Sequence, residues 1–198
     1  MRRETGEDEL ARMFRGDDVD VLLELARHRP GRVVRFLTGR LYAADQDEKW
    51  RAVGMFGVLA GQPGLLTDGK RHDLLQRFLW ALNDESGTVP FGVPEVIGEI
   101  LAARPEHRAS LLPILCGMLT NAETFQTGPV ERGLYWALGR IGPDVCHHCP
   151  AVLAVVAAAA RSHPDAETRA TAAAAFAHLG VPVTPGVDTH RKAKEEMC

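Results

Sequence analysis

The sequence lacks the long apolar run that a membrane-spanning helix requires. Its longest apolar stretch runs from Pro150 to Ala160, whereas a spanning helix needs about 20 mainly apolar residues. The opening residues, MRRETGEDELARMF, contain no apolar core of the kind found in a secretory signal peptide. We therefore expect a cytoplasmic protein with no membrane partner, whose cysteines are mostly reduced thiols.

An excess of positive charge is also missing. The chain of 198 residues has 23 lysines and arginines against 26 aspartates and glutamates, which leaves a net charge of −3. Nucleic-acid-binding proteins present a basic field to the phosphates, so we expect no nucleic-acid partner. The length is sufficient for a full hydrophobic core.

Complete catalytic and metal-binding signatures are absent as well. The sequence has no EF-hand loop, no His-Glu-x-x-His and no Walker sequence. It also has no Glu-x-x-His pair of the kind that di-iron bundles place on facing helices. We therefore predict no catalytic residue and no cofactor, and an enzymatic function is not favoured.

The sharpest chemical motif that is present is a Cys-x-x-Cys, at Cys146 and Cys149. Such a motif can activate a thiol at a helix start, or bind zinc when two further ligands converge. No second Cys-x-x-Cys follows, and a redox motif normally belongs to a βαβ setting. We expect an ordinary turn here, with redox chemistry and metal binding as the alternatives.

A small residue followed two positions later by an aliphatic one recurs along the chain. Its positions are Gly57, Gly98, Gly139 and Ala177, at intervals of 41, 41 and 38 residues (98−57, 139−98, 177−139). A second apolar helix follows each of the first three. A helix–turn–helix unit of about 40 residues is typical of an α-solenoid, with the small residue where two helices touch.

Three segments resemble HEAT repeats of the short, alanine-rich kind named after phycobilisome lyases. They are LNDESGTVPFGVPEVIGEILAARPE, ERGLYWALGRIG and HPDAETRATAAAAFAHLG. The resemblance covers roughly residues 45–181 and implies an all-α, armadillo-type fold: a right-handed superhelix of stacked helix pairs, about ten helices in all. We expect N-terminal capping helices over residues 1–44, the repeats over 45–181 and a flexible tail over 182–198.

The repeats predict which side chains are buried and which can bind. The first well-formed unit places Trp50 on the inner stripe with apolar neighbours, and the second helix of each pair should line a concave groove. Exposed basic side chains on those second helices and beside them are candidate binding residues: Arg71, His72, Arg77 and His107.

The irregular stretch from Asn83 to Pro94 contains Gly87, Pro90 and Gly92, so it is either a tight connector or a binding loop. It brings acidic residues together: Asp84, Glu85, Glu95 and Glu99. Glu99 and Arg140 hold the same position in successive units, which predicts an ion pair between repeats. Arg132 is a further candidate partner for these acids. We expect Asp84 and Glu85 to serve an external basic group.

Helix pairs stacked in this way present surfaces that bind peptides and proteins, although function must be argued from sites and not from a fold. We therefore expect a non-catalytic interaction scaffold that binds another protein or an extended peptide along its concave surface. The alternative is a lyase-type or cofactor-handling accessory protein, which would use the Asp84–Glu99 region or the Cys146–Cys149 motif.

Overall fold

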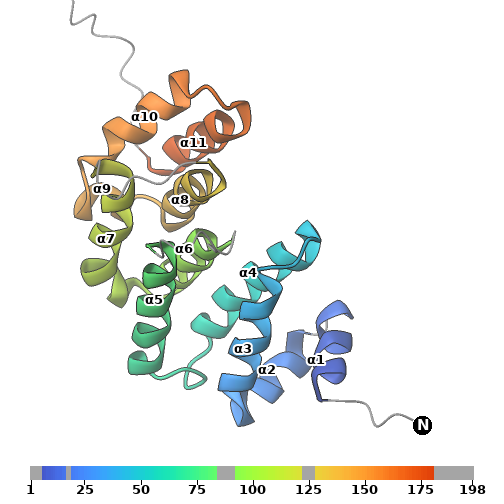
Figure 1. Ribbon diagram of the computed structural model, residues 1–198. Coiled ribbons are helices and arrows are strands. Elements are labelled where there is room, and N and C mark those ends of the chain that lie inside the picture. Colours follow the sequence, from blue (N-terminus) through green and yellow to red (C-terminus); the bar gives the residue numbers. More distant parts are fainter. Residues whose placement is uncertain (1–5, 17–18, 84–91, 122–127, 181–198) are drawn as a thin grey trace, which may run out of the picture.

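The computed structural model describes residues 6–16, 19–83, 92–121 and 128–180, and within these ranges it contains helices and no strand (Figure 1). The prediction of an all-α protein is confirmed for this part of the chain. In chain order the elements are α1 (Gly6–Arg15), α2 (Val19–His28), α3 (Pro30–Arg40), α4 (Gln46–Gly61), α5 (Asp68–Leu82), α6 (Val93–Ala103), η1 (Pro105–His107), α7 (Arg108–Thr120), α8 (Gly128–Ile141), α9 (Asp144–His148), α10 (Val152–Ser162) and α11 (Ala166–His178).

Several helices begin at residues that satisfy the free backbone N–H groups of a first turn. The side chain of Asp45 accepts from the N–H of Asp47 at 2.9 Å, and that of Asp165 accepts from the N–H of Thr168 at 2.7 Å. Proline stands in the first turn of α3 and α6, where its missing donor costs nothing. The starts of these helices are therefore encoded locally.

The first helices of the successive units pack against one another in order, α4 on α6, α6 on α8 and α8 on α11. Behind them α5 packs on α6, α7 on α8 and α10 on α11. Figure 1 shows α4, α6, α8 and α11 following one another along one side of the molecule, with α5, α7 and α10 along the other. The N-terminal helices α1, α2 and α3 pack together and contact α4 through α2 and α3.

Glycines lie where these first helices come closest. A Cβ atom on Gly98 would be 2.7 Å from the Cα of Ala137 in α8, and one on Gly139 would be 2.8 Å from the Cα of Ala175 in α11. A Cβ on Gly57 would collide with the Glu99 carboxylate of α6. All three glycines of the repeating pattern therefore lie at contacts between consecutive units.

The fourth position of that pattern behaves differently. Ala177 is exposed in α11, and the residue that meets Gly139 is Ala175. In the described residues α11 is the last helix of the stack, so no following unit packs against the side of α11 on which Ala177 lies. The prediction of a helix contact at Ala177 is therefore wrong.

Two arginines close the ends of first helices, one across two units and one within a unit. Arg104 donates to the carbonyl oxygens of Ala60 and Gly61, which end α4. Arg108 donates to the carbonyls of Leu101 at 2.7 Å and Ala102 at 2.9 Å, which end α6. The last carbonyls of a helix have no partner within it, and positive charge is favourable there. Arg104 therefore stabilises a helix end and the contact between consecutive units, and Arg108 stabilises a helix end and the pairing of α6 with α7.

A continuous hydrophobic core extends from α1 to α11. Trp50, predicted on the inner stripe of α4, is instead 39% exposed. Its ring lies against Trp136 of α8 and not among the core side chains. Among the described residues, no helix is both long enough and apolar enough to span a bilayer.

The contact at Gly98 can be tested with alanine substitutions in two helices. Gly98→Ala should destabilise the chain by about 1 to 3 kcal/mol, because the added methyl group meets backbone and cannot be avoided by turning a side chain. Gly54→Ala, at an exposed helical site with open space around it, should be neutral or stabilising by about 0.5 to 1 kcal/mol. Urea unfolding of both variants measures the difference, and equal stabilities would contradict the contact.

Candidate functional site

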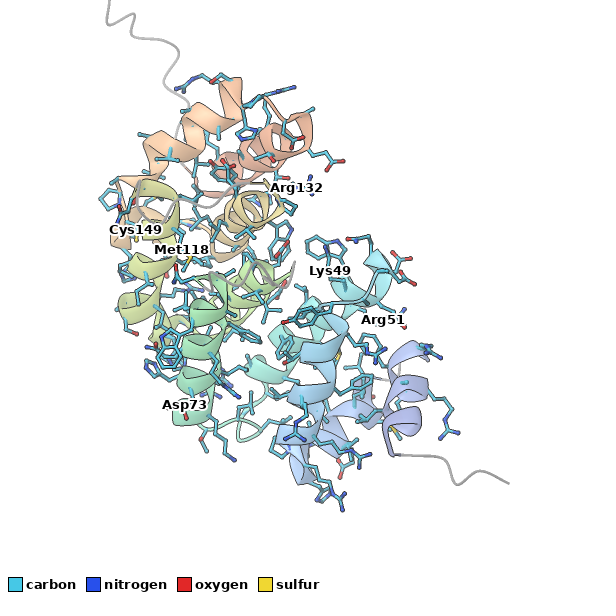
Figure 2. All side chains as sticks on the ribbon, viewed as in Figure 1. Lys49, Arg51, Asp73, Met118, Arg132 and Cys149 are labelled. Atoms are coloured by element: carbon cyan, nitrogen blue, oxygen red, sulfur yellow. The ribbon has the colours of Figure 1, made fainter. Side chains whose placement is uncertain are left out.

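A hollow of about 330 Å³ opens on the face of the first helices, and we call it the tryptophan cleft. Four different helices supply its lining: Gln46, Lys49 and Trp50 from α4, Glu95 from α6, Pro129, Arg132 and Trp136 from α8, and Glu167 and Thr171 from α11. The cleft therefore depends on the stack as a whole. Figure 2 shows Lys49 and Arg132 on facing walls of the opening between α4 and the α8–α11 pair.

Two tryptophans from non-adjacent helices meet at this cleft. The ring centroids of Trp50 in α4 and Trp136 in α8 are 5.2 Å apart, with their planes tilted by 53°. Helix α6 lies between α4 and α8 in the stack. Side chains can meet over an intervening helix only if that helix is set back, so the face is concave here and α6 forms its floor.

The floor carries a buried acid. Glu95 stands in the first turn of α6 and is only 7% exposed. Its carboxylate fits against α8 because Gly133 has no side chain, and a Cβ there would be 2.8 Å from Oε2. Among the described residues, this Oε2 atom has no hydrogen-bond partner. A buried acceptor without a donor costs free energy, so this carboxylate requires an explanation.

Burial raises the pKa of Glu95 above its ordinary value. Three smaller effects act in the opposite direction: a hydrogen bond from its own backbone N–H, and the positive charges of Lys49 and Arg132. The carboxyl group is therefore held in a site that penalises its charged form. An additional donor or positive charge in the cleft would relieve that penalty.

The two cations of the cleft have different surroundings. Arg132 forms an ion pair with Glu167 of α11, so its charge is engaged within the wall. Lys49 places its ammonium over the ring of Trp50, 5.4 Å from the ring centroid, as in a cation–π interaction. Its aliphatic stem passes near Gly92 at the start of α6.

A second hollow of about 440 Å³ continues along the groove between α8 and α11, and we call it the alanine hollow. It shares Trp136 and Thr171 with the tryptophan cleft. The remaining lining residues are mostly small: Gly139, Arg140, Ala170, Ala174, Ala175 and His178. The groove is therefore lined by polar and aromatic side chains at one end and mostly by small residues at the other.

The buried acid of α8, Glu131, differs from Glu95 of α6. It is 4% exposed. Its Oε1 accepts from the hydroxyl of Tyr135 at 3.0 Å and lies 3.4 Å from Nε2 of His163. Glu131 thus ties α8 to the turn before α11, and its partners come from the chain itself.

The predicted residues Glu99 and Arg140 lie together. Arg140 donates to both carboxylate oxygens of Glu99, at 2.8 and 3.2 Å. The carboxylate fits against Gly57 of α4, so the pair joins α6 to α8 beside the contact with α4. The hydrogen bond that Arg140 donates to Glu99 raises the pKa of Arg140, which keeps the guanidinium charged.

The basic face predicted on the second helices is only partly present. Arg77 is exposed and His72 is partly buried. Arg71 and His107, which we expected to be exposed, are 4% and 7% exposed. Arg71 turns back to donate to the Leu66 carbonyl and pair with Asp68.

His107 lies in the short η1 helix, where its ring centroid is 6.3 Å from that of His72. Burial lowers its pKa, so the neutral form is favoured. Asp68, Glu106 and His107 offer ligand atoms within 4.8 Å of one another. The Arg71 guanidinium, however, pairs with Asp68 and lies 3.8 Å from Glu106. An arginine thus already neutralises the acids that a metal ion would need.

The two sulfurs of the Cys-x-x-Cys motif have different partners. Cys146 donates from its thiol to the carbonyl of Leu179 at 3.4 Å, while Cys149, just after α9, interacts with Cys116 of α7. Burial raises the pKa of the Cys116 thiol and of the Cys149 thiol. In the part of the chain that the structure describes, neither cysteine of the motif belongs to a group of three potential metal ligands.

Two predicted binding residues, Asp84 and Glu85, lie outside the described residues, as do most of the loop and the tail over 182–198. Sequence reasoning placed the groove on the second helices. Two hollows, of about 150 and 420 Å³, do lie between α3 and the second helix α5 and include the predicted Arg77, whereas the two hollows described above lie on the first helices. Sequence reasoning singled out Glu95 and Arg132 among the loop acids and their partners but did not predict the tryptophan pair. Comparisons with protein-family models, with curated proteins and with solved structures found no match to this chain.

The raised pKa of Glu95 predicts how Glu95→Gln changes stability with pH. The folded chain holds this proton to a higher pH than the unfolded chain, whose carboxyl has an ordinary pKa of 4.5. The stabilisation that the protonated Glu95 carboxyl gives the folded chain is therefore full at low pH, and it is lost as pH rises through the folded pKa. Relative to the parent, Glu95→Gln should gain stability in urea unfolding as pH rises from the unfolded pKa through the raised folded pKa of Glu95, and no further above it. A difference that stays constant with pH would contradict the assignment.

The Glu99–Arg140 pair predicts a small, salt-dependent coupling. Because Arg140 is half exposed, Glu99→Gln should cost less than about 1 kcal/mol. A double-mutant cycle with Arg140→Gln should show a coupling of about 0.5 kcal/mol that falls at high salt. In a Gly57→Ala background, where the new methyl group displaces the carboxylate, the coupling should disappear. A coupling that survives there would show that the pair does not depend on the contact at Gly57.

Proposed function

We propose that this chain is a non-catalytic interaction module, a HEAT-like α-solenoid that binds an extended segment of another protein. The segment lies along the groove of α4, α6, α8 and α11. The observation that carries the proposal is the tryptophan pair, Trp50 and Trp136, at a concave surface where one ring is 39% exposed. Exposed indoles in a concavity are typical of binding surfaces.

The shape of the groove supports an extended segment over a compact ligand. The tryptophan cleft and the alanine hollow are of about 330 and 440 Å³, and they share two residues. Two connected hollows of this size suit successive side chains of one chain. The small residues of α11 allow a backbone to come close, and the indoles provide apolar area for a side chain.

The acids of the loop keep a part in this proposal. Residues 84–91 join α5 to α6, and the first turn of α6 supplies Glu95 to the cleft. Asp84 and Glu85 are thus close in the chain to the binding surface and remain candidate contacts for a basic partner. The lyase-type alternative gains no observation of its own, since the sulfurs of Cys146 and Cys149 have separate partners.

A peptide library displayed on phage, selected against the full chain, tests the proposal. The selected peptides should bind the parent and lose at least about tenfold in affinity for the double variant Trp50→Ala, Trp136→Ala. Trp80→Ala is the matched control, because Trp80 is 72% exposed on α5 and lines neither hollow. Peptides that bind the tryptophan double variant as tightly as the parent would place binding elsewhere, and the proposal would fail.

A further inference from the structure

We infer that the tryptophan cleft receives a positively charged side chain, the ammonium of a lysine or the guanidinium of an arginine, from the bound segment. The inference rests on the proposed function, because it names the chemistry of the partner at the groove described above. It is carried by one buried acid with an oxygen that has no hydrogen-bond partner in the described residues, and by the two indoles that line the same hollow.

Glu95 is the group that needs a cation. It is more than nine-tenths buried, it lines the cleft, and its Oε2 atom has no partner in the described part of the chain. Rotation about the terminal bond of the side chain is soft, so either oxygen can turn toward the hollow. A charged donor compensates a buried carboxylate better than a neutral donor does, because it adds charge to the hydrogen bond.

The comparison with Glu131 strengthens this assignment. The same stack buries both acids to a similar degree. Glu131 receives the Tyr135 hydroxyl and faces His163, and it lines neither hollow. The acid whose contacts come from side chains of the chain lies away from the groove, and the acid with a buried oxygen that has no hydrogen-bond partner lies in the groove.

The indoles provide the second half of the cation site. The ammonium of Lys49 already lies over Trp50, which shows that a cation fits at this ring face. Trp136 lies beside it, with the two planes tilted by 53°. Two ring faces and a carboxylate are the groups that bind alkylammonium and guanidinium ions.

An anionic side chain fits the cleft less well. Of the two cations that could receive it, Arg132 is engaged by Glu167, and an added anion would lie in the same hollow as the Glu95 carboxylate. A cation meets the charge of Arg132, which the ion pair with Glu167 offsets, and the ammonium of Lys49. That group stands at the end of a flexible side chain, and it can move into solvent when another cation takes its place.

The indole N–H signals of the full, nitrogen-15-labelled chain provide the test. The chain has three tryptophans, Trp50, Trp80 and Trp136, and each contributes one such signal to an NMR spectrum. The probes are the capped amino acids Nα-acetyl-lysine amide and Nα-acetyl-arginine amide. Their neutral counterparts, the norleucine and citrulline derivatives, and the acidic glutamate derivative serve as controls.

The basic probes should shift the signals of Trp50 and Trp136, leave that of Trp80 in place and saturate, while the controls produce no saturable shift. Two variants should change the affinity in opposite directions. Glu95→Gln should weaken binding by about tenfold or more, because a charge-assisted hydrogen bond is lost. Lys49→Met should strengthen it by about threefold, because a competing cation is removed from the ring face.

The results test the cation inference separately from the proposed function. If the norleucine or glutamate derivative shifts Trp50 and Trp136 as strongly as the lysine derivative, the groove binds side chains but does not select a cation. The inference then fails and the proposed function stands. Equal affinity of the lysine probe for the parent and for Glu95→Gln would likewise overturn the cation inference and leave the proposed function standing. If no probe shifts either signal, the cation inference is also overturned, and the phage selection decides separately whether the groove binds a segment.

Discussion

The close approach of the first helices is the contact on which the rest of this structure depends. At Gly98 and Gly139 the next helix lies so near that a single methyl group would meet its backbone. Glycine at these sites allows α6, α8 and α11 to pack at short distance. The tryptophan pair can then form over α6, between α4 and α8. If the helices were forced apart, the floor, the walls and the aromatic contact of the cleft would change together.

The acids of the stack fall into two groups, and this division connects stability to function. Glu99 and Glu131 have partners from the chain, Arg140 for the first and Tyr135 with His163 for the second. These contacts join consecutive units. Glu95 occupies a comparable place in α6, but one of its oxygens has no hydrogen bond. A chain that pairs Glu99 and Glu131 but leaves a buried oxygen of Glu95 without a donor in a concave, aromatic site accepts a local cost in stability, and such costs are characteristic of binding sites.

Part of this site could have been found from the repeating glycine pattern. Trp50 and Arg132 stand seven residues before a register glycine (57−50, 139−132), and Glu95 and Trp136 stand three before one (98−95, 139−136). Positions three and seven residues apart share one face of a helix, so the register that predicted the contacts also marked the cleft-lining face. The basic residues of the second helices were a poorer guide. Charge alone predicted exposure for Arg71 and His107, whereas a carbonyl and an acid near Arg71 draw it inward and the η1 turn buries His107.

Local sequence patterns were enough to predict the helical class of the protein and the contact glycines. Apolar periodicity, helix caps and the absence of a side chain act within a few residues of their position. The concave face could not be predicted in this way, because it depends on how each helix packs against its neighbours. Only the tertiary structure decided which acids have partners. Glu95, Glu99 and Glu131 are the same residue type on similar helices, and only the packed neighbours leave one of them with a free oxygen beside two tryptophans.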